Sequence, residues 1–202
     1  MDRSKKAVEA FRSAKETIGE ITKGYSMFGL TRGQFSMIDV ITAVIDSVGS
    51  VENLSLWTWC IADYEVQCFE RIVSDGRVKN ATLVIDSAAR QKNRAQLERW
   101  IDRFGIGTIR FVVNHAKIAT IEGGGMRVLC RGSMNLNYNP RFEQFDIDEG
   151  HPGFDLIRKT EAELPILEMS HLNGEARKAS KIEQAWKQDE LKIFNPGKVW
   201  AK

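Results

Sequence analysis

The chain has 202 residues, of which 43% are hydrophobic and 28% are charged, and its formal net charge at pH 7 is +2. This composition is typical of a folded globular protein with one ordinary domain and an appendage, or two small domains at most, and it excludes a mostly disordered chain. No stretch approaches the ~20 consecutive apolar residues of a membrane-spanning helix, and the N-terminus lacks the apolar core of a secretory signal. The net charge is too small to indicate nucleic-acid binding, which would need a local basic surface.

The cysteines indicate the compartment. There are three of them, an odd number, and they are widely spaced among apolar neighbours. We therefore expect buried, reduced thiols in a cytoplasmic protein, rather than a disulfide framework or a zinc site. They are Cys60, Cys68 and Cys130.

The first part of the chain predicts a helix followed by a loop. Residues 1–24 carry charged side chains around a thin apolar stripe, which is typical of a surface helix. Residues 24–34 contain three glycines and predict a loop. We therefore expect an N-terminal helix and loop over residues 1–34.

Helices and strands alternate through the next part of the chain. The helix expected to begin at Ser36 is apolar on most sides and ends before Gly49, so it should be largely buried. Its apolar period of three and four residues changes to alternation after Gly49. The other expected elements are helices at 63–73 and 88–103 and strands at 54–61, 81–85 and 108–113.

Hairpin-linked strands follow. Residues 115–121 and 126–130 flank the turn sequence Glu122-Gly-Gly-Gly125, and 142–147 predict one more short strand. This order predicts an α/β fold with a mixed β-sheet flanked by helices on both faces. The composition changes after Gly150, so we expect a central domain over residues 35–150 and a helical C-terminal appendage over residues 151–202.

One group of polar residues suits phosphate chemistry. His115 and Lys117 are two apart on a predicted strand, so their side chains leave the same face of the sheet, and Ser133 and Asn135 repeat that spacing. Lysine, serine and asparagine donate hydrogen bonds to phosphate oxygens, and histidine is the candidate nucleophile or proton carrier. Glu143 is expected to accept the ring N–H of His115 and fix its tautomer.

The order His115-x-Lys117, Glu122, Gly132-Ser133-x-Asn135 and Glu143 resembles the HKD motif of the phospholipase D superfamily. It is most similar to the small bacterial single-motif members, which include a non-specific endonuclease and a restriction-enzyme catalytic domain. The resemblance implies a phospholipase D-like α/β sandwich, in which residues 35–150 are the catalytic domain and Glu122 and Gly132 are structural. Family members usually have aspartate in place of Glu122, and the gap from there to Gly132 is longer than usual.

The resemblance also implies a two-step phosphodiester transfer without a metal or another cofactor. His115 would attack phosphorus and form a phosphohistidine, a second histidine would protonate the leaving oxygen, and water would release the product. The chain has one such motif, because His151 and His171 lack the lysine. Single-motif members of the family form a symmetric homodimer with one composite site, and we expect the same here.

Three functions remain open. The first is a nuclease that acts on DNA, and the second, a lipid phosphodiesterase, is disfavoured because no membrane-binding loop stands out. The third is a catalytically silent protein that binds nucleic acid or serves in an assembly. Arg110, Arg131 and Arg141 are expected to line a phosphate path, although the acidic run 143–149 works against a strongly basic cleft.

Two further groups are expected to be structural. Trp57, Trp59 and Trp100 fall in core-like patterns, so we do not expect them to stack on bases. The basic face of the helix at 88–103 is expected to be solvated, with contact to a phosphate backbone as the alternative.

Overall fold

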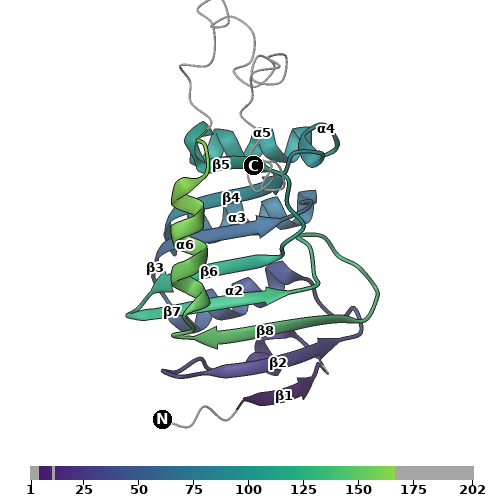
Figure 1. Ribbon diagram of the computed structural model, residues 1–202. Coiled ribbons are helices and arrows are strands. Elements are labelled where there is room, and N and C mark those ends of the chain that lie inside the picture. The colour runs from purple at the N-terminus through teal and green to yellow at the C-terminus, as the bar shows by residue number, and fades with distance from the viewer. Residues whose placement is uncertain (1–4, 11, 167–202) are drawn as a thin grey trace, which may run out of the picture.

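The computed structural model describes residues 5–10 and 12–166. The chain folds into one eight-stranded mixed sheet with helices on both faces (Figure 1). The strands are β1 (Lys6–Glu9), β2 (Ser26–Thr31), β3 (Val51–Thr58), β4 (Val78–Asp86), β5 (Ile109–Val112), β6 (Ile118–Gly123), β7 (Met126–Gly132) and β8 (Glu143–Glu149). The helices are α1 (Ala14–Ile18), α2 (Met37–Val48), α3 (Asp63–Ser74), α4 (Ala89–Lys92), α5 (Arg94–Phe104) and α6 (Gly153–Glu163), with a 3₁₀ turn at Ile106–Thr108.

The sheet combines a parallel and an antiparallel part. Its strand order is β1-β2-β8-β7-β6-β3-β4-β5, in which β3, β4 and β5 are parallel and the strands from β3 through β6, β7 and β8 to β2 are antiparallel. Helix α6 crosses one face, and α2 and α3 lie behind the other (Figure 1). The prediction of a mixed sheet flanked by helices on both faces is confirmed.

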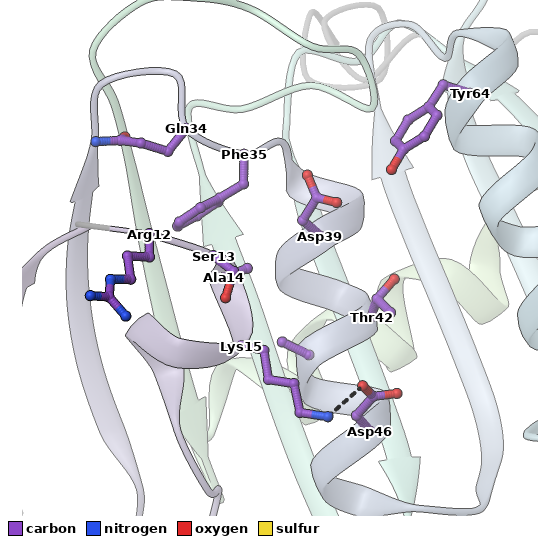
Figure 2. Close-up of a pocket in the computed structure, with 11 residues that line it drawn as sticks. Arg12, Ser13, Ala14, Lys15, Gln34, Phe35, Asp39, Thr42, Asp46 and Tyr64 are labelled. Carbon is purple, nitrogen blue, oxygen red and sulfur yellow. Dashed lines mark hydrogen bonds and ion pairs between the residues drawn. The ribbon is translucent and has the colours of Figure 1, made fainter.

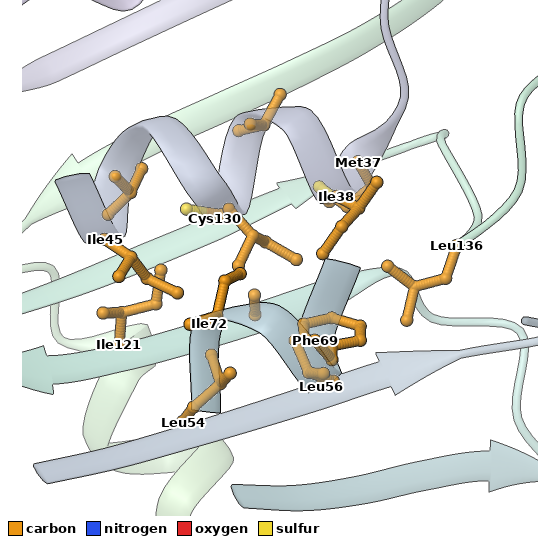
Figure 3. Close-up of a cluster of buried hydrophobic side chains, with 14 of the residues drawn as sticks. Met37, Ile38, Ile45, Leu54, Leu56, Phe69, Ile72, Ile121, Cys130 and Leu136 are labelled. Carbon is orange, nitrogen blue, oxygen red and sulfur yellow. The ribbon is translucent and has the colours of Figure 1, made fainter. Parts of the chain in front are cut away.

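The main core lies between the sheet and helices α2 and α3. Helix α2 begins at a capping box in which the Ser36 backbone N–H donates to Asp39 Oδ2 over 2.7 Å, and it ends at Gly49, whose φ is 85°. Its apolar side chains pack with those of α3 onto the sheet (Figure 3). Residues shown there include Ile38 and Ile45 of α2, Phe69 and Ile72 of α3, and Leu54, Leu56, Ile121 and Cys130 of the strands.

Helix α6 covers the opposite face through a small apolar cluster and a buried carboxylate. Glu161 accepts hydrogen bonds from Ser55, from Trp57 Nε1 at 3.3 Å and from Arg158 at 2.7 Å. These partners satisfy a carboxylate that would otherwise be costly to bury. The apolar cluster consists of Val84, Val112 and Leu164, with Trp57 packed against it.

The predictions for the N-terminal part are wrong. The segment expected to be a helix contains β1 and the short α1, and the segment expected to be a loop contains β2. Gly29 is buried within β2 because the Phe145 ring of β8 occupies the space where a side chain would be, with an ideal Cβ only 2.2 Å from Cζ. Glycine there permits close packing rather than a turn. Lys6 and Glu9 are exposed because β1 is an edge strand, where charges are tolerated.

Most other expected elements are present. Helices α2 and α3 lie where predicted, the helix at 88–103 is divided at Asn93 into α4 and α5, and β8 is the last predicted strand. The β6–β7 hairpin turns at Gly124 and Gly125, whose φ values of 55° and 72° suit a two-residue primed turn. Of the predicted appendage, α6 is a helix, and residues 167–202 lie outside the described residues.

Two findings concern the cysteines and the membrane. All three cysteines are free, and Cys130 is buried as predicted, whereas Cys60 and Cys68 are half-buried. Burial raises the pKa of the Cys130 thiol to about 12. Within residues 5–10 and 12–166, no helix combines the length and apolar character needed to cross a membrane.

Candidate active site

His115 and Lys117 lie on the segment that connects β5 to β6, which we call the crossing. Strand β5 is an edge strand and β6 lies beyond β4 and β3, so residues 113–117 step across the ends of those two strands (right-hand side of Figure 1). The expectation that His115 and Lys117 lie on a strand is therefore wrong. Pairing with β7 begins only where the Lys117 carbonyl accepts the Gly132 N–H at 3.1 Å.

Asn114 and Asp86 fix this crossing. The Asn114 backbone N–H donates to Asp86 Oδ2 at 2.8 Å, and its side-chain amide donates to the Thr58 carbonyl at 3.0 Å. Its Oδ1 accepts the N–H of Ala116 at 2.9 Å, and Asp86 Oδ1 accepts that of Ala88, also at 2.8 Å. Both Asn114 and Asp86 are buried. The sequence interpretation gave neither a role, although a carboxylate that ends an apolar strand was the available signal.

His115 is exposed, and Lys117 is buried beneath it. Lys117 Nζ lies 3.1 Å from His115 Nδ1, 3.2 Å from Nε2 and 2.7 Å from the His115 carbonyl oxygen. Lys117 Nζ is thus nearly equidistant from the two ring nitrogens, and it donates a hydrogen bond to the His115 carbonyl oxygen. The arrangement places an imidazole against a cation where β3, β4 and β5 end.

Burial governs the charge of Lys117. It lowers the pKa of the Lys117 ammonium, and the neighbouring Cys60 and Glu143 act in the opposite direction. An anion that reached the site would replace solvent around this cation. The buried ammonium is thus a ready partner for a phosphate oxygen.

Ser133 and Glu143 bind each other. Ser133 Oγ donates to Glu143 Oε2 and accepts the Gln144 N–H at 3.0 Å, while Asn139 Nδ2 donates to Glu143 Oε1 at 3.2 Å. The expected hydrogen bond from the His115 ring to Glu143 is not formed, and Glu143 instead accepts from Ser133 and Asn139. These bonds tie the end of β7 to the start of β8.

Asn135 lies on the loop that follows β7. Its side chain is half-buried, and its Oδ1 is buried without a hydrogen-bond partner among the described residues. A buried amide with unused hydrogen-bonding capacity is costly unless a ligand or water completes it. Asn135 therefore remains a candidate ligand-binding residue.

The two structural positions of the motif fit their expected roles. Glu122 lies at the far end of β6, next to the hairpin turn, where Oε2 accepts from Asn53 Nδ2 at 2.9 Å. At Gly132 a Cβ would lie 2.3 Å from the Gln144 carbonyl oxygen, so glycine permits β8 to approach β7.

The structure does not bring the three arginines together. Arg110 donates to the carbonyls of Gly107 at 2.5 Å and Ile109 at 3.1 Å, and burial lowers its pKa. Arg131 pairs with Asp148 at 2.9 Å, so both of these arginines are engaged within the fold. Arg141 is exposed and lies two residues before Glu143.

Most acidic side chains of β8 are paired. Asp146 bonds Lys5, and Glu149 accepts the Gly24 N–H at 2.7 Å and Lys23 Nζ at 3.1 Å. With Asp148 paired as well, the acidic run contributes less negative charge than its sequence indicates.

The predicted core position of Trp59 is wrong. Trp100 is buried and Trp57 is half-buried, but 40% of Trp59 is exposed, and its ring centroid lies 6.3 Å from that of His115. Strand β3 ends at Thr58, so Trp59 falls just beyond the sheet. In the sequence, the alternation typical of a strand continues past Thr58. It therefore did not reveal that Trp59 lies outside the sheet.

The basic face of α5 is solvated and internally paired. Arg94 bonds Glu98 at 3.0 Å, and Arg99 bonds Glu70 of α3 at 2.5 Å. These ion pairs favour the structural interpretation of this helix over contact with a phosphate backbone.

A separate cleft of about 540 Å³ lies beside α1 and α2 (Figure 2). It is lined by side chains of both charges, including Lys15 and Asp46, whose Nζ and Oδ2 lie 3.4 Å apart. None of the motif residues lines it. Within the described part of the chain, no three His, Cys, Asp or Glu side chains are grouped so that they could hold a metal.

No protein-family model matches the chain, and no curated protein matches it. Two solved structures are similar in fold. Phosphatidylserine synthase of Haemophilus influenzae Rd KW20 is 14% identical over 81% of this chain and 44% of its own, with a TM-score of 0.48. Polyphosphate kinase of Porphyromonas gingivalis is 15% identical over 68% of this chain and 26% of its own, with a TM-score of 0.50. The chain thus spans less than half of either protein. The likeness to the kinase concerns the fold alone, which in this chain is an α/β sandwich with a mixed sheet.

Proposed function

We propose that the chain is a metal-independent phosphodiesterase that cleaves DNA through a phosphohistidine at His115. The observation that carries the proposal is the exposed imidazole held against a buried ammonium at the edge where β3, β4 and β5 end. Ligands of open α/β sheets commonly bind at the carboxyl ends of parallel strands. A nucleophile beside a phosphate-binding cation at that edge is suited to phosphoryl transfer.

The first step replaces one partner of Lys117 with another. Without substrate, Lys117 donates to the His115 carbonyl and lies against the ring. A bound phosphate would accept hydrogen bonds from Lys117, which brings phosphorus next to an unprotonated nitrogen of the His115 ring. The nitrogen then attacks phosphorus, the P–O bond to the leaving nucleoside breaks, and the departing oxygen takes a proton from a second histidine. In the second step, that histidine removes a proton from water, which attacks phosphorus and breaks the P–N bond.

The second histidine comes from another copy of the chain. His151 is unsuited, because its Nδ1 accepts the Gly153 N–H at 2.9 Å at the start of α6. That position follows β8, at the opposite end of the strand from Glu143. His171 lies outside the described residues. A homodimer with a twofold axis through the site would supply His115 from each subunit.

DNA is proposed as the substrate because of exposed cations on segments next to the motif residues. Lys92 is exposed and acts electrostatically on Cys60, next to Trp59, and Arg141 is exposed two residues before Glu143. The alternative is a catalytically silent protein that has kept the fold and binds nucleic acid. The two functions share a binding surface and differ in whether His115 forms a covalent bond.

The test is cleavage of plasmid and single-stranded DNA in EDTA. Wild-type protein is expected to cleave, His115→Ala to be inactive, and the matched control His151→Ala to cleave like wild type. DNA binding without cleavage by the wild-type protein would favour the silent alternative. Cleavage that survives in His115→Ala would overturn the proposed site.

A further inference from the structure

Three exposed aromatic side chains lie on the two segments that adjoin the candidate site. Trp59 is 40% exposed, Tyr138 is 60% exposed and Phe142 is 65% exposed. They come from the end of β3 and from the loop between β7 and β8. We call these three residues the aromatic rim. Tryptophan and tyrosine, which combine an apolar ring with a polar group, are enriched at binding surfaces.

The loop that carries Tyr138 is attached on both sides of the site. Asn137 Oδ1 accepts the Cys60 thiol at 3.7 Å, next to Trp59, and Asn139 Nδ2 donates to Glu143 at 3.2 Å. Tyr138 lies between these two attachments. The backbone of Tyr138 is therefore held between the end of β3 and the start of β8.

The ring of Phe142 makes a cation–π contact with an arginine. The Arg32 guanidinium carbon lies 5.4 Å from the centroid of its ring, and Arg32 also bonds Glu9 at 2.6 Å. Gly33 packs so closely on the loop that a Cβ there would lie 2.6 Å from Pro140 Cα. Phe142 thus lies on a well-supported loop, next to the exposed Arg141.

We propose that the aromatic rim stacks on unpaired bases on either side of the phosphate at His115, so that the substrate is single-stranded DNA. The proposal rests on the proposed function, which places the phosphate that is cleaved at His115. Aromatic rings interleaved with cations are the usual surface for single strands, because every unpaired base exposes a face for stacking. In a duplex those faces are covered by neighbouring bases, so the rim would gain nothing. Trp59 comes from one segment, and Tyr138 and Phe142 come from another in which asparagine, proline and arginine separate the two rings.

The test compares three DNA probes of equal length by fluorescence anisotropy, using His115→Asn protein to prevent cleavage. The probes are a short single strand, the same strand with abasic sites around its centre, and the corresponding duplex. We expect the single strand to bind most tightly. Trp59→Ala and Phe142→Ala should each weaken single-strand binding roughly 5- to 150-fold and leave duplex binding unchanged. Trp59→Phe should retain most of the affinity, and Tyr64→Ala, an exposed aromatic on α3, should retain all of it.

Several results would overturn the proposal. These are equal affinity for the intact and abasic strands, rim substitutions that weaken duplex binding equally, and rim substitutions that turn a dimer into a monomer, which would make the rim a subunit contact. The two proposals fail separately. Rim-dependent binding without cleavage by the wild-type protein would contradict the nuclease alone, whereas His115-dependent cleavage with no preference for single strands would contradict the rim alone.

Discussion

At the scale of single residues, the position of His115 depends on groups outside the motif. Asp86 accepts two backbone N–H groups through its two carboxylate oxygens, and one of them belongs to Asn114. Asn114 in turn holds the chain on either side of His115. The motif spacing predicted His115 and Lys117 as neighbours, which the structure confirms. It could not predict the crossing, because that depends on β5 and β6 being separated by two strands.

Asp86→Asn should destabilise the protein and disturb the site. An amide keeps one acceptor oxygen and presents a donor to the other N–H, so one buried N–H loses its partner. We expect the free energy of unfolding to fall by about 1–3 kcal/mol, measured by urea denaturation. Asp102→Asn, at an exposed position of α5, is the control and should unfold like wild type. Equal stability of the two variants would show that Asp86 does not support the crossing.

Lys117→Met should abolish most activity while the protein remains folded. Methionine retains much of the buried apolar length but cannot donate to a phosphate oxygen, so the rate of DNA cleavage should fall roughly 10²–10³-fold. Lys79→Met, at an exposed position of β4, provides the matched control. Should both variants cleave at the wild-type rate, Lys117 would have no role in binding phosphate.

At the scale of elements, the accuracy of the predictions followed burial. Helices α2 and α3 carry strong apolar periodicity, because each buries one face against the sheet, and both were predicted. Strand β2 was not predicted because Gly29 indicated a loop. The reason for glycine at this position is its contact with the Phe145 ring of β8, more than a hundred residues away in sequence. Strand β1 was missed because an edge strand buries little. Local patterns cannot report such long-range contacts.

Gly29→Ala should destabilise the sheet between β2 and β8. The added Cβ would lie 2.2 Å from Phe145 Cζ, and that ring is fully buried against Phe35, so it has little room to move. We expect a loss of about 1–3 kcal/mol in unfolding free energy. Gly107→Ala, where the nearest atom is 3.9 Å away, should have little effect in the same denaturation experiment. A Gly29→Ala protein as stable as Gly107→Ala would contradict this packing.

At the level of the whole molecule, the proposed reaction requires that two copies of the chain share one active site. One His115 cannot be both nucleophile and proton donor in the same step, and His151 is committed to the start of α6. The fold likeness concerns one chain, so the dimer remains a prediction. A site shared by two subunits would make activity depend on pairs of intact subunits rather than on single subunits.

Mixed dimers test this dependence. Wild-type and His115→Ala subunits, co-expressed with different tags, should assemble at random, and a dimer with one His115 lacks either the nucleophile or the acid. At equal amounts, activity per total protein should fall to about a quarter of the wild-type value, because a quarter of the dimers keep both histidines. A fall to about half would mean that each subunit acts alone.

The most direct test of the central claim is to trap the covalent intermediate. Labelled DNA would be mixed with wild-type protein in EDTA, quenched in alkali and digested, and the labelled peptide identified by mass spectrometry. We predict a phosphoramidate on His115 that is stable in base, is lost in acid and is absent from His115→Ala. Label on another residue, or cleavage that stops in EDTA and returns with magnesium, would contradict the account.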